Sequence, residues 1–360
     1  MKIAILGTRG IPARYGGFET LAEQLSSRLA SHGHEVTVYC RRPFTTPGDV
    51  VDPKVRRVIL PTISHKYFDT AFHTFLSAIH VSFTNAEVVL FCNVANSPWV
   101  WIPRLFGKPT VLNVDGLDRK RRKWNFLARG FLSVCEALAT FTPSRIVTDA
   151  RLIQEYYRCR FGKNSTVISY GAEVPPGSDN LEGVDLAPRQ YILYVSRLEP
   201  ENNPELVIDA YRQLQTDWPL VMVGGNPYDE AYVARLKSLA DARVIFLGGI
   251  YGPGYWQLLK NAGLYIFACE VGGVHPALVE AMVAGNTVLY LDTPENRETA
   301  ADGAQPFQPA AADLASQLTR LLANDRLRRD LGQKARQRAE SVFSWETVTR
   351  SYESLFAQLL

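Results

Sequence analysis

The sequence predicts an α/β protein with two doubly wound domains, each built on a parallel sheet. Short apolar runs of strand length alternate with helix-length amphipathic segments, and glycine-rich turns follow several of the apolar runs. The length of 360 residues suits two domains, and 46% hydrophobic residues are enough for two buried cores. Residues 174–188 carry the strongest linker composition and separate two similar α/β series.

The first series begins with a buried strand, a long glycine-rich loop, an amphipathic helix and a second strand, at residues 2–6, 7–20, 21–31 and 35–40. This β-loop-α-β opening predicts a parallel sheet. Further strands are expected at residues 55–60, 88–92, 110–114, 146–148 and 166–168. The loop lacks the G-x-G-x-x-G spacing of a dinucleotide-binding turn, and Gly16 and Gly17 stand just before the helix. It therefore suits a diphosphate or a sugar at the helix start better than NAD.

The second series repeats the pattern after the linker. Strands are expected at residues 191–195, 220–223, 244–247, 264–268 and 287–291, a helix at 205–214, and a helical tail at 311–360. We therefore place the domains at residues 1–173 and 174–342, with a C-terminal helix at 343–360 that packs back on the first domain. The glycine turns of both halves suggest one ligand held across a cleft between them.

The stretch from residue 264 to residue 283 is the strongest candidate site. A buried strand leads into a Gly-Gly pair at 272–273, a His275-Pro276 step follows, and a helix pattern then begins. The free N–H groups of a helix start and a glycine turn that allows close approach form an anion site, and proline fits the first helical turn. Glu280 is expected about one turn into the helix, within reach of a ribose hydroxyl. The alternative is a structural turn followed by a solvated glutamate.

Two features of the first series are further candidates. Asp115 follows the strand at 110–114, at the carboxyl edge where ligands of parallel sheets collect, and a turn-forming aspartate is the alternative. Residues 119–124, Arg-Lys-Arg-Arg-Lys-Trp, are the densest positive cluster, and apolar residues follow at helical spacing at 126, 127, 131 and 132. This segment suits an anionic membrane surface or a phosphate-bearing acceptor, or else it is a solvated charge run that leads into a core helix.

Composition disfavours several other classes. A formal net charge of +3 is too small to argue for nucleic acid as a partner. The five cysteines are odd in number and show no Cys-x-x-Cys spacing, which favours the reduced thiols of a cytoplasmic protein over a disulfide framework or a zinc site. The N-terminus is too short for a signal peptide and no apolar stretch reaches spanning length, so we expect a soluble protein or one attached to a membrane surface.

Four motifs together resemble one family. They are residues 6–20 (Leu-Gly-Thr-Arg-Gly-Ile-Pro-Ala-Arg-Tyr-Gly-Gly-Phe-Glu-Thr), 114–117 (Val-Asp-Gly-Leu), 197–203 (Arg-Leu-Glu-Pro-Glu-Asn-Asn) and 271–282, from Val-Gly-Gly to Glu-Ala-Met. The chain is similar to the GT-B glycosyltransferases of family 4, and most similar to the bacterial subgroup with a DUF1972-type N-terminal domain, which includes rhamnosyltransferases. The resemblance covers nearly the whole chain, and its first motif is the most specific.

The resemblance implies two Rossmann-like domains facing across a cleft and a retaining transfer of a hexosyl or deoxyhexosyl group, with rhamnose a candidate. The donor would be a nucleotide diphosphate sugar, and the acceptor a saccharide or lipid-linked saccharide of bacterial polysaccharide synthesis. The first domain would bind the acceptor and the second the donor, with peripheral contact at the inner membrane. No cofactor is implied, and no Asp-x-Asp metal motif stands out, so we expect metal-independent transfer.

The family pattern also implies roles for single residues. Arg197 would neutralise the diphosphate, Glu280 would hold the ribose, and Asp115 would lie beside the transferred sugar; these three form the expected catalytic set. The remaining donor contacts would come from Gly16, Gly17, Asn202, Gly249, Ile250, Tyr251, Glu270, Gly272, Gly273, Val274, His275 and Pro276. Contacts with the acceptor or the membrane are expected from Arg14, Tyr15, Arg121, Arg122, Lys123 and Trp124.

The sequence departs from the family pattern at two positions. Asn202 stands where many members have a phosphate-binding lysine, and Gly272 stands where they have the first of two glutamates. Glu270 is a candidate substitute, and Arg9 or Arg14 could assist Arg197. The departures leave two alternatives open: a sugar-nucleotide epimerase of the same architecture, and a nucleotide-sugar-binding protein without catalysis. The missing dinucleotide fingerprint disfavours a nicotinamide oxidoreductase.

Overall fold

The computed structural model describes residues 1–14, 16–63, 69–117, 119, 125–177, 181, 183, 185–226 and 229–360. The chain divides into two compact units: unit 1 contains Met1–Gly171 and Trp345–Leu360, and unit 2 contains Ala172–Ser344. Each boundary lies two residues from the one expected from the sequence. All five cysteines are free; four are buried, and Cys159 is exposed.

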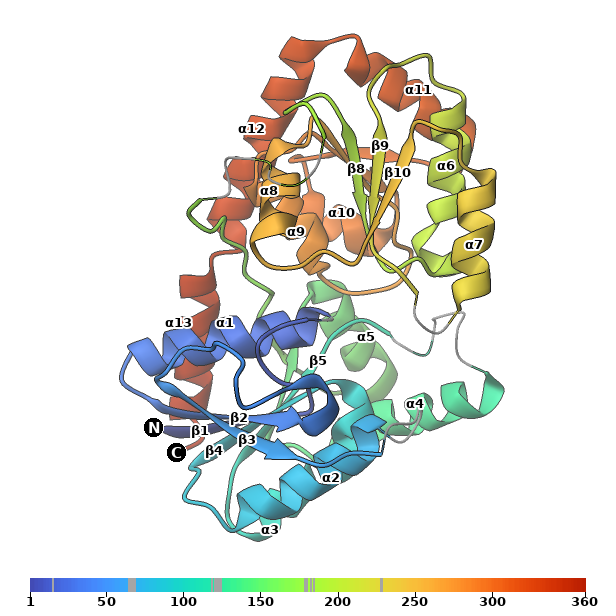
Figure 1. The fold of residues 1–360 in the computed structure, drawn as a ribbon. Helices are drawn as coiled ribbons and strands as arrows, with labels where there is room; N and C mark the ends of the chain where they lie inside the picture. The colour runs from blue at the N-terminus through green and yellow to red at the C-terminus, as the bar shows by residue number, and fades with distance from the viewer. Residues whose placement is uncertain are drawn as a thin grey trace. The chain divides into compact units, whose positions relative to one another are not determined.

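Unit 1 is built on one parallel sheet. Its strands are β1 (Lys2–Leu6), β2 (Glu35–Arg41), β3 (Val55–Leu60), β4 (Val88–Cys92), β5 (Thr110–Val114), β6 (Arg145–Thr148) and β7 (Thr166–Val167), in the spatial order β3-β2-β1-β4-β5-β6-β7. Its helices are α1 (Gly17–Ser31), α2 (Asp69–Ser82), α3 (Trp101–Leu105), α4 (Phe126–Leu138), α5 (Arg151–Phe161) and α13 (Trp345–Ala357), with 3-10 turns η1 (Arg42–Phe44) and η2 (Val94–Trp99). In Figure 1, α1 and α13 lie on one face of this sheet, and α2, α3 and α4 on the other.

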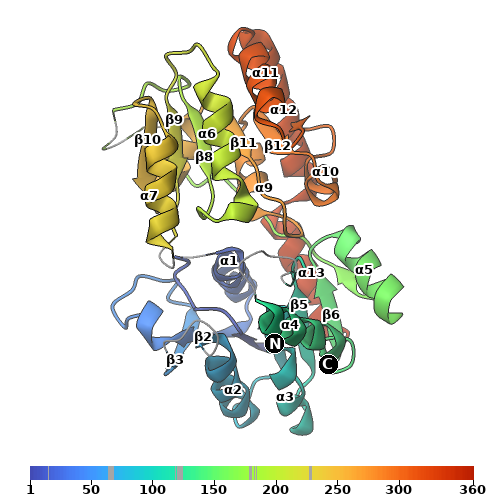
Figure 2. The same cartoon turned by 90° about the vertical axis from the view of Figure 1, so that its right-hand side faces the viewer.

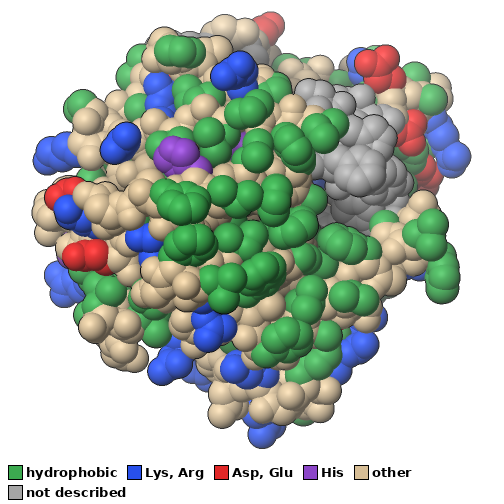
Figure 3. All heavy atoms as spheres, turned by 90° about the horizontal axis from the view of Figure 1, so that it is seen from below, with side chains coloured by type: hydrophobic (Ala, Val, Ile, Leu, Met, Phe, Trp, Pro, Cys, Tyr) green, Lys and Arg blue, Asp and Glu red, His purple; other side chains and the backbone are tan. Residues whose placement is uncertain are grey.

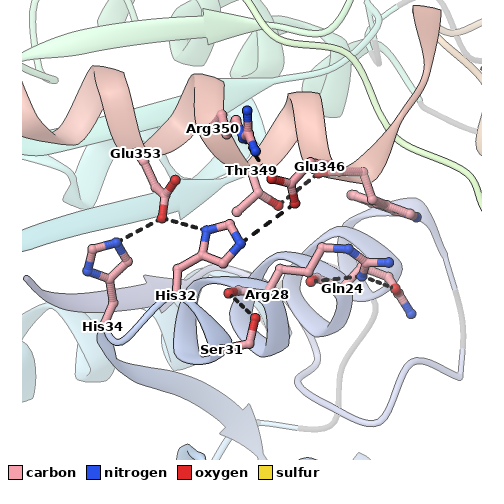
Figure 4. A network of polar contacts seen from close by, with 10 residues as sticks. Gln24, Arg28, Ser31, His32, His34, Glu346, Thr349, Arg350 and Glu353 are labelled. Atoms are coloured by element: carbon pink, nitrogen blue, oxygen red, sulfur yellow. Dashed lines mark hydrogen bonds and ion pairs between the residues drawn. The ribbon is translucent and has the colours of Figure 1, made fainter. Parts of the chain in front are cut away.

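The C-terminal helix α13 packs against α1 within unit 1. One carboxylate oxygen of Glu353 lies 2.9 Å from Nδ1 of His32 and 2.9 Å from Nε2 of His34, two residues that follow α1 (Figure 4). Because an ionised carboxylate only accepts hydrogen bonds, Nδ1 of His32 and Nε2 of His34 each carry a proton in this arrangement. The Trp345 ring occupies the space that a side chain at Gly171 would need. These contacts hold the end of the chain on unit 1.

Unit 2 repeats the arrangement with six parallel strands. They are β8 (Ile192–Val195), β9 (Leu220–Val223), β10 (Val244–Gly248), β11 (Leu264–Phe267), β12 (Val288–Leu291) and β13 (Gln305–Phe307), in the order β10-β9-β8-β11-β12-β13. The helices are α6 (Pro204–Arg212), α7 (Glu230–Leu239), α8 (Pro253–Asn261), α9 (Pro276–Val283), α10 (Pro294–Ala300), α11 (Ala311–Leu322) and α12 (Asp325–Val342), with the 3-10 turn η4 (Pro200–Asn202). Figure 2 shows α6 and α7 side by side against the strands.

Both sheets have the strand order of a doubly wound α/β fold. In unit 2 a buried core lies between the sheet and the helices α6 and α11, and it includes Tyr194, Met222, Val207 and Leu318. Strands buried on both faces are continuous apolar runs, which is why the sequence pattern located them well. The strand order reverses between β1 and β4 in unit 1 and between β8 and β11 in unit 2. Ligands of such sheets bind outside the carboxyl ends at these switch points.

Three local predictions are wrong or incomplete. The loop expected at residues 7–20 ends earlier, because α1 begins at Gly17, and Glu19 turns back to accept a hydrogen bond from the Arg9 N–H at 2.8 Å. The expected helical tail at 311–360 is three separate helices, α11, α12 and α13. The strand β13 was not expected, because it contains Pro306 and lies at the sheet edge, where proline is tolerated.

Candidate functional site

The carboxyl ends of β8, β9 and β10 form a tight set of turns in unit 2. Gly224 has φ +135°, and a Cβ at this position would overlap the backbone oxygen of Ser196. The Gly224 N–H donates to the Gly248 carbonyl at 2.7 Å. Only glycine therefore fits where these strand ends meet. The turn after β8 carries Arg197, and the turn after β10 carries Gly249, Ile250 and Tyr251.

Arg197 is placed by its neighbours at the end of β8. Its Nη1 lies 3.7 Å from Oε1 of Glu199, and its side chain is 34% exposed. The Asn202 side-chain amide donates to the Arg197 carbonyl at 2.7 Å, while the Asn202 carbonyl accepts from the buried Tyr194 hydroxyl at 2.8 Å. Asn202, predicted as a donor contact, is itself only 2% exposed. In this structure it supports the Arg197 backbone.

A second polar contact joins the turn after β8 to the turn after β11. Asn203 adopts a left-handed conformation with φ 54°, and its side-chain amide donates to the Ala268 carbonyl at 3.0 Å and to Oε1 of Glu270 at 3.1 Å. The Glu270 N–H donates to the Glu201 carbonyl at 2.9 Å. These bonds fix Glu270 at the switch point of the sheet. Asn203 was not among the predicted site residues.

The Gly-Gly turn before α9 is shaped by His275. A Cβ built at Gly272 would overlap the His275 imidazole, whose ring centroid lies 4.9 Å from that of Phe267. The imidazole therefore occupies the space that a larger residue at 272 would need. His275 is the N-cap residue of α9, and Pro276 lies in the first helical turn, as predicted. Gly273 and Val274 are buried, so any contact they make with a ligand would involve the backbone.

Glu280 lies in α9 and forms a pair with Tyr255 from α8. The Tyr255 hydroxyl donates to Oε2 of Glu280 at 2.6 Å. Burial raises the pKa of the Glu280 carboxyl, and the hydrogen bond from Tyr255 opposes that rise. Burial and the nearby Glu280 charge hold the pKa of Tyr255 well above its ordinary value, so the phenol keeps its proton to donate. Sequence reasoning missed Tyr255, because nothing in the spacing between 255 and 280 indicates a contact.

The remaining predicted residues of the second half are Gly249, Ile250 and Tyr251, in the turn after β10. The Tyr251 ring lies against Gly249, 3.2 Å from where a Cβ at that glycine would be, and Tyr251 is 56% exposed. The turn from Gly249 to Tyr251 is thus open to solvent at the end of β10. It offers an exposed aromatic ring and backbone groups next to the β8 and β9 ends.

In unit 1 the corresponding edge carries the predicted glycines and Asp115. Gly16 is the N-cap of α1 and Gly17 its first residue, so N–H groups of the first turn are free of intrahelical partners. Asp115 follows β5, and one of its carboxyl oxygens is buried. Burial, followed by the Asp115 charge, holds the pKa of Tyr170 well above its ordinary value. Asp115 therefore lies in a low-dielectric setting at the carboxyl edge of the sheet.

The predicted acceptor or membrane contacts are only partly described. Nη2 of Arg14 lies 2.8 Å from Oδ1 of Asp49, so this arginine forms an ion pair within unit 1. Tyr15, Arg121, Arg122, Lys123 and Trp124 lie outside the described residues. Arg119, which precedes the last four, is anchored by Glu136, a buried carboxylate that accepts from Arg119 Nε at 3.0 Å and from the Tyr156 hydroxyl at 2.6 Å.

Two kinds of feature are absent from the part of the chain that the structure describes. No group of three or more His, Cys, Asp and Glu side chains is arranged to hold a metal ion there. None of the helices formed by those residues combines the length and the apolar character needed to cross a bilayer.

Family models match both halves of the chain. The model described as Glycosyltransferase Family 4 matches residues 15–174, and the model described as Glycosyl transferases group 1 matches residues 185–338. The first match covers most of unit 1 and ends at residue 174, just inside unit 2, and the second lies within unit 2. Two parallel-sheet domains matched in this way define a protein of the GT-B class. The chain belongs to the GT-B glycosyltransferases of family 4.

Individual relatives agree with this assignment. The chain is 28% identical over 170 residues to a Campylobacter jejuni protein, the N-acetylgalactosamine-N,N'-diacetylbacillosaminyl-diphospho-undecaprenol 4-alpha-N-acetylgalactosaminyltransferase; the alignment covers 46% of each chain. The chain thus spans about half the length of that relative. Among solved structures, a sucrose-phosphate synthase from Thermosynechococcus elongatus has a TM-score of 0.81 at 21% identity, covering 99% of this chain and 98% of that one. Anabaena HepE in complex with UDP and glucose has a TM-score of 0.78 at 16% identity, covering 99% and 100%.

Proposed function

We propose that the protein is a retaining glycosyltransferase. It moves a hexosyl or deoxyhexosyl group from a nucleotide diphosphate sugar to a saccharide or lipid-linked saccharide acceptor in bacterial polysaccharide synthesis. The observation that carries the proposal is the arrangement at the switch point of the unit 2 sheet. There a partly exposed Arg197 follows β8, and the N-terminus of α9, with Glu280 inside the helix, follows the neighbouring strand β11.

Each of these groups suits one part of a nucleotide diphosphate. The Arg197 guanidinium and the free N–H groups at the start of α9 favour the negative diphosphate. The Glu280 carboxylate accepts hydrogen bonds from ribose hydroxyls, while Tyr255 holds its other oxygen. The open turn at Gly249, Ile250 and Tyr251 is the proposed contact for the base. The name of the HepE structure, which contains UDP, supports this class of ligand.

The proposed chemistry is stabilisation of the leaving diphosphate. One preorganised donor is worth roughly 2.7–4 kcal/mol, and one helix start roughly 0.3–2 kcal/mol. Enzymes typically lower the barrier by about 8–23 kcal/mol, so Arg197 and helix starts need the further contribution of positioning donor and acceptor together. A donor phosphate oxygen takes the proton of the acceptor hydroxyl as the new glycosidic bond forms on the same face and the bond from the sugar to the diphosphate breaks. We propose that this transfer needs no metal ion.

Unit 1 is the proposed acceptor domain. Asp115, at the carboxyl edge of its sheet, is the proposed neighbour of the transferred sugar, and the Gly16-Gly17 helix start of α1 is a second anion site. The Campylobacter relative is named for a diphospho-undecaprenol acceptor, which supports a lipid-linked acceptor here. Rhamnose as the donor sugar rests on the resemblance of the first motif to rhamnosyltransferases.

A thermal-shift screen against UDP, GDP, dTDP, ADP and their sugar conjugates tests the donor site. A ligand at about 100 Kd adds about 2.7 kcal/mol to the stability of the domain that binds it. For a domain of this size that is roughly a 5–11 °C rise in melting temperature. One base should stand out, and Arg197→Ala should lower turnover about 10²- to 10³-fold with little loss of stability.

Activity and binding assays on the same purified protein distinguish the rival functions. Conversion of the nucleotide sugar without any acceptor would indicate an epimerase, and tight binding without turnover on any glycan or lipid-linked acceptor would indicate a binding protein. Transfer that stops in excess chelator and returns with a divalent cation would contradict the metal-independent mechanism. No thermal shift with any nucleotide would refute the donor site.

A further inference from the structure

A buried carboxylate anchors Arg119 beyond the carboxyl end of β5. The Glu136 side chain, in α4, is only 2% exposed, and its Oε2 accepts from Arg119 Nε at 3.0 Å and from the Tyr156 hydroxyl at 2.6 Å. Arg119 Nη2 in turn donates to the Tyr156 hydroxyl at 3.0 Å. A buried carboxylate is costly unless it is paired and hydrogen-bonded, and these two partners meet that need. We call the three side chains, each bonded to the other two, the Arg119 clamp.

The clamp leaves part of the Arg119 guanidinium available to a ligand. A guanidinium carries five N–H groups, and among the described residues only Glu136 and Tyr156 accept from this one. The remaining N–H groups, on Nη1 and Nη2, form the fork with which arginine binds phosphate or carboxylate oxygens in pairs. The Arg119 side chain is 28% exposed, so an anion can approach it from solvent.

The charges around Tyr156 also favour an anion. Arg119 Cζ lies 5.6 Å from the centroid of the Tyr156 ring, and Arg160 Cζ lies 5.7 Å from the same centroid. Two cations thus meet at this ring with one buried carboxylate, Glu136, which is already paired with Arg119. Burial and the hydrogen bond to Glu136 raise the pKa of Tyr156, so the phenol keeps its proton and adds no negative charge.

The clamp lies near Asp115, the residue proposed to stand beside the transferred sugar. Arg119 follows Asp115 by four residues in the segment after β5. Tyr157 is only 1% exposed, and its pKa is raised first by burial, then by the charge of Glu136 and, more weakly, by that of Asp115. Both carboxylates therefore lie close to one phenol, and an anionic group held by Arg119 would be bound next to the proposed site of transfer.

Positive charge alone does not mark a binding position on unit 1. On the face of the molecule that Figure 3 shows, Lys and Arg side chains are dispersed around hydrophobic ones. A long surface side chain that nothing orients loses rotamer entropy when it binds a ligand. Arg119 is held at two of its nitrogens before any ligand arrives, so less of this entropy is lost. It is also the only residue of the basic segment 119–124 that the structure describes.

We propose that the Arg119 clamp binds a phosphate group of the acceptor. Arg119 contacts two phosphate oxygens, Glu136 and Tyr156 hold the guanidinium in place, and Arg160 adds positive charge. The inference rests on the proposed function and deepens it, because it takes unit 1 as the acceptor domain. It narrows the acceptor to the phosphate-bearing class, that is, a saccharide linked through phosphate or diphosphate to its carrier.

Isothermal titration with pyrophosphate and geranyl diphosphate, without nucleotide, tests the proposal. The measurements use the Arg197→Ala variant as the parent, so that the proposed donor site loses its main cation. Both diphosphates should bind and geraniol should not, and adding Arg119→Gln should weaken both about 10- to 150-fold. Arg119→Lys, which keeps the charge without the fork, should retain only part of the affinity. The control is Arg158→Gln, at an exposed α5 position paired with Glu155, and it should bind like the parent.

Tyr156→Phe tests whether Tyr156 acts as a positioning residue. The change removes the hydroxyl that accepts from Arg119 Nη2 and keeps the aromatic ring. It should weaken diphosphate binding about 2- to 10-fold in the parent and have no further effect once Arg119→Gln is present, because it acts through Arg119. An ion pair with a purely structural role would instead lower the melting temperature in both variants and leave the affinity for diphosphate unchanged.

Three results would overturn the proposal. Diphosphate binding that persists in Arg119→Gln would move the phosphate to another site, such as the start of α1. Geraniol that binds as tightly as geranyl diphosphate would show that the phosphate is not recognised, and an equal loss in Arg158→Gln would indicate a general effect of surface charge. With Arg197 intact, the nucleotide-induced thermal shift should be the same in Arg119→Gln as in the wild type. No shift with any nucleotide, beside diphosphate binding that depends on Arg119, would count against the donor site alone.

Discussion

Replacing Glu280 by Gln should weaken nucleotide binding without lowering the stability of the folded protein at pH 8. Burial raises the pKa of this carboxyl above its ordinary value, so the folded protein binds its proton more tightly than the unfolded chain does. The stability that this group contributes is therefore fully present below pH 4.5 and is lost as the pH rises through the raised pKa. As the pH rises through that raised pKa, the wild type comes to bury an ionised carboxylate. Glutamine keeps an oxygen that can accept from Tyr255 but carries no charge.

The expected magnitude follows from the proposed ribose contact. A hydrogen bond to a charged group contributes about 1.5–3 kcal/mol, so the Glu280→Gln variant should bind its nucleotide about 10- to 150-fold more weakly. Its melting temperature at pH 8 should equal or exceed that of the wild type, and this advantage should shrink as the pH falls toward 4.5. Isothermal titration gives the affinity, and melting curves at several pH values give the stability.

Two further variants make the test specific. Tyr255→Phe removes the donor that lowers the pKa of Glu280, so the loss of nucleotide affinity on acidification should begin at a higher pH than in the wild type. Glu230→Gln, at an exposed position in α7, should change neither the nucleotide affinity nor the melting temperature. An unchanged affinity in Glu280→Gln would refute the ribose contact. A melting temperature that falls at pH 8 would show that the ionised carboxylate stabilises the fold, contrary to this reasoning.

Three other predictions concern protein stability and follow from packing and hydrogen bonds in the structure. Gly272→Glu should destabilise unit 2 by about 1–3 kcal/mol, because its side chain meets the His275 ring, and adding His275→Ala should recover most of the loss in urea unfolding. Tyr265→Phe should cost less than about 0.5 kcal/mol in the same assay, because the buried hydroxyl has no hydrogen-bond partner among the described residues; a cost typical of a lost hydrogen bond, about 1 kcal/mol, would count against this. Glu353→Ala should destabilise unit 1 by about 1–2 kcal/mol, because Glu353 bonds to His32 at 2.9 Å. The carboxylate of Glu346 is half exposed and lies 3.6 Å from His32, so Glu346→Ala should cost less than about 0.5 kcal/mol. Equal effects of the two substitutions would contradict the bonding in Figure 4.

The strands could be predicted because of how parallel sheets are buried. Runs such as Val88–Cys92 are covered on both faces, so every residue is apolar and the pattern is unambiguous. The helices were harder wherever polar residues face inward. In α2 the buried His73 is held by its Nε2, 3.1 Å from the Cys40 carbonyl, and this compensation is invisible in the sequence. The buried face of α2 is therefore partly polar, and an apolar stripe in the sequence does not locate it.

Some residues of the candidate site could be predicted from the sequence and others could not. Arg197, Glu280 and the Gly-Gly turn follow strands directly, so their place at the carboxyl edge could be inferred from position along the chain. Tyr255 and Asn203 act through contacts between elements that are distant in sequence, and residue type alone gives no sign of them. Position predicts which side chains reach an edge of the sheet, whereas the pairings among them depend on tertiary packing.

The two departures from the family pattern have structural partners of their own. Asn202 is buried, with its amide on the Arg197 carbonyl, so a lysine there would place an ammonium where a neutral amide now bonds to the backbone. At Gly272 the missing side chain leaves room for the His275 ring. Glu270, two residues earlier, is held by Asn203. Both positions are therefore packed or hydrogen-bonded in this structure. In the proposed mechanism Arg197 and the start of α9 carry the charge that a second cation would otherwise have carried.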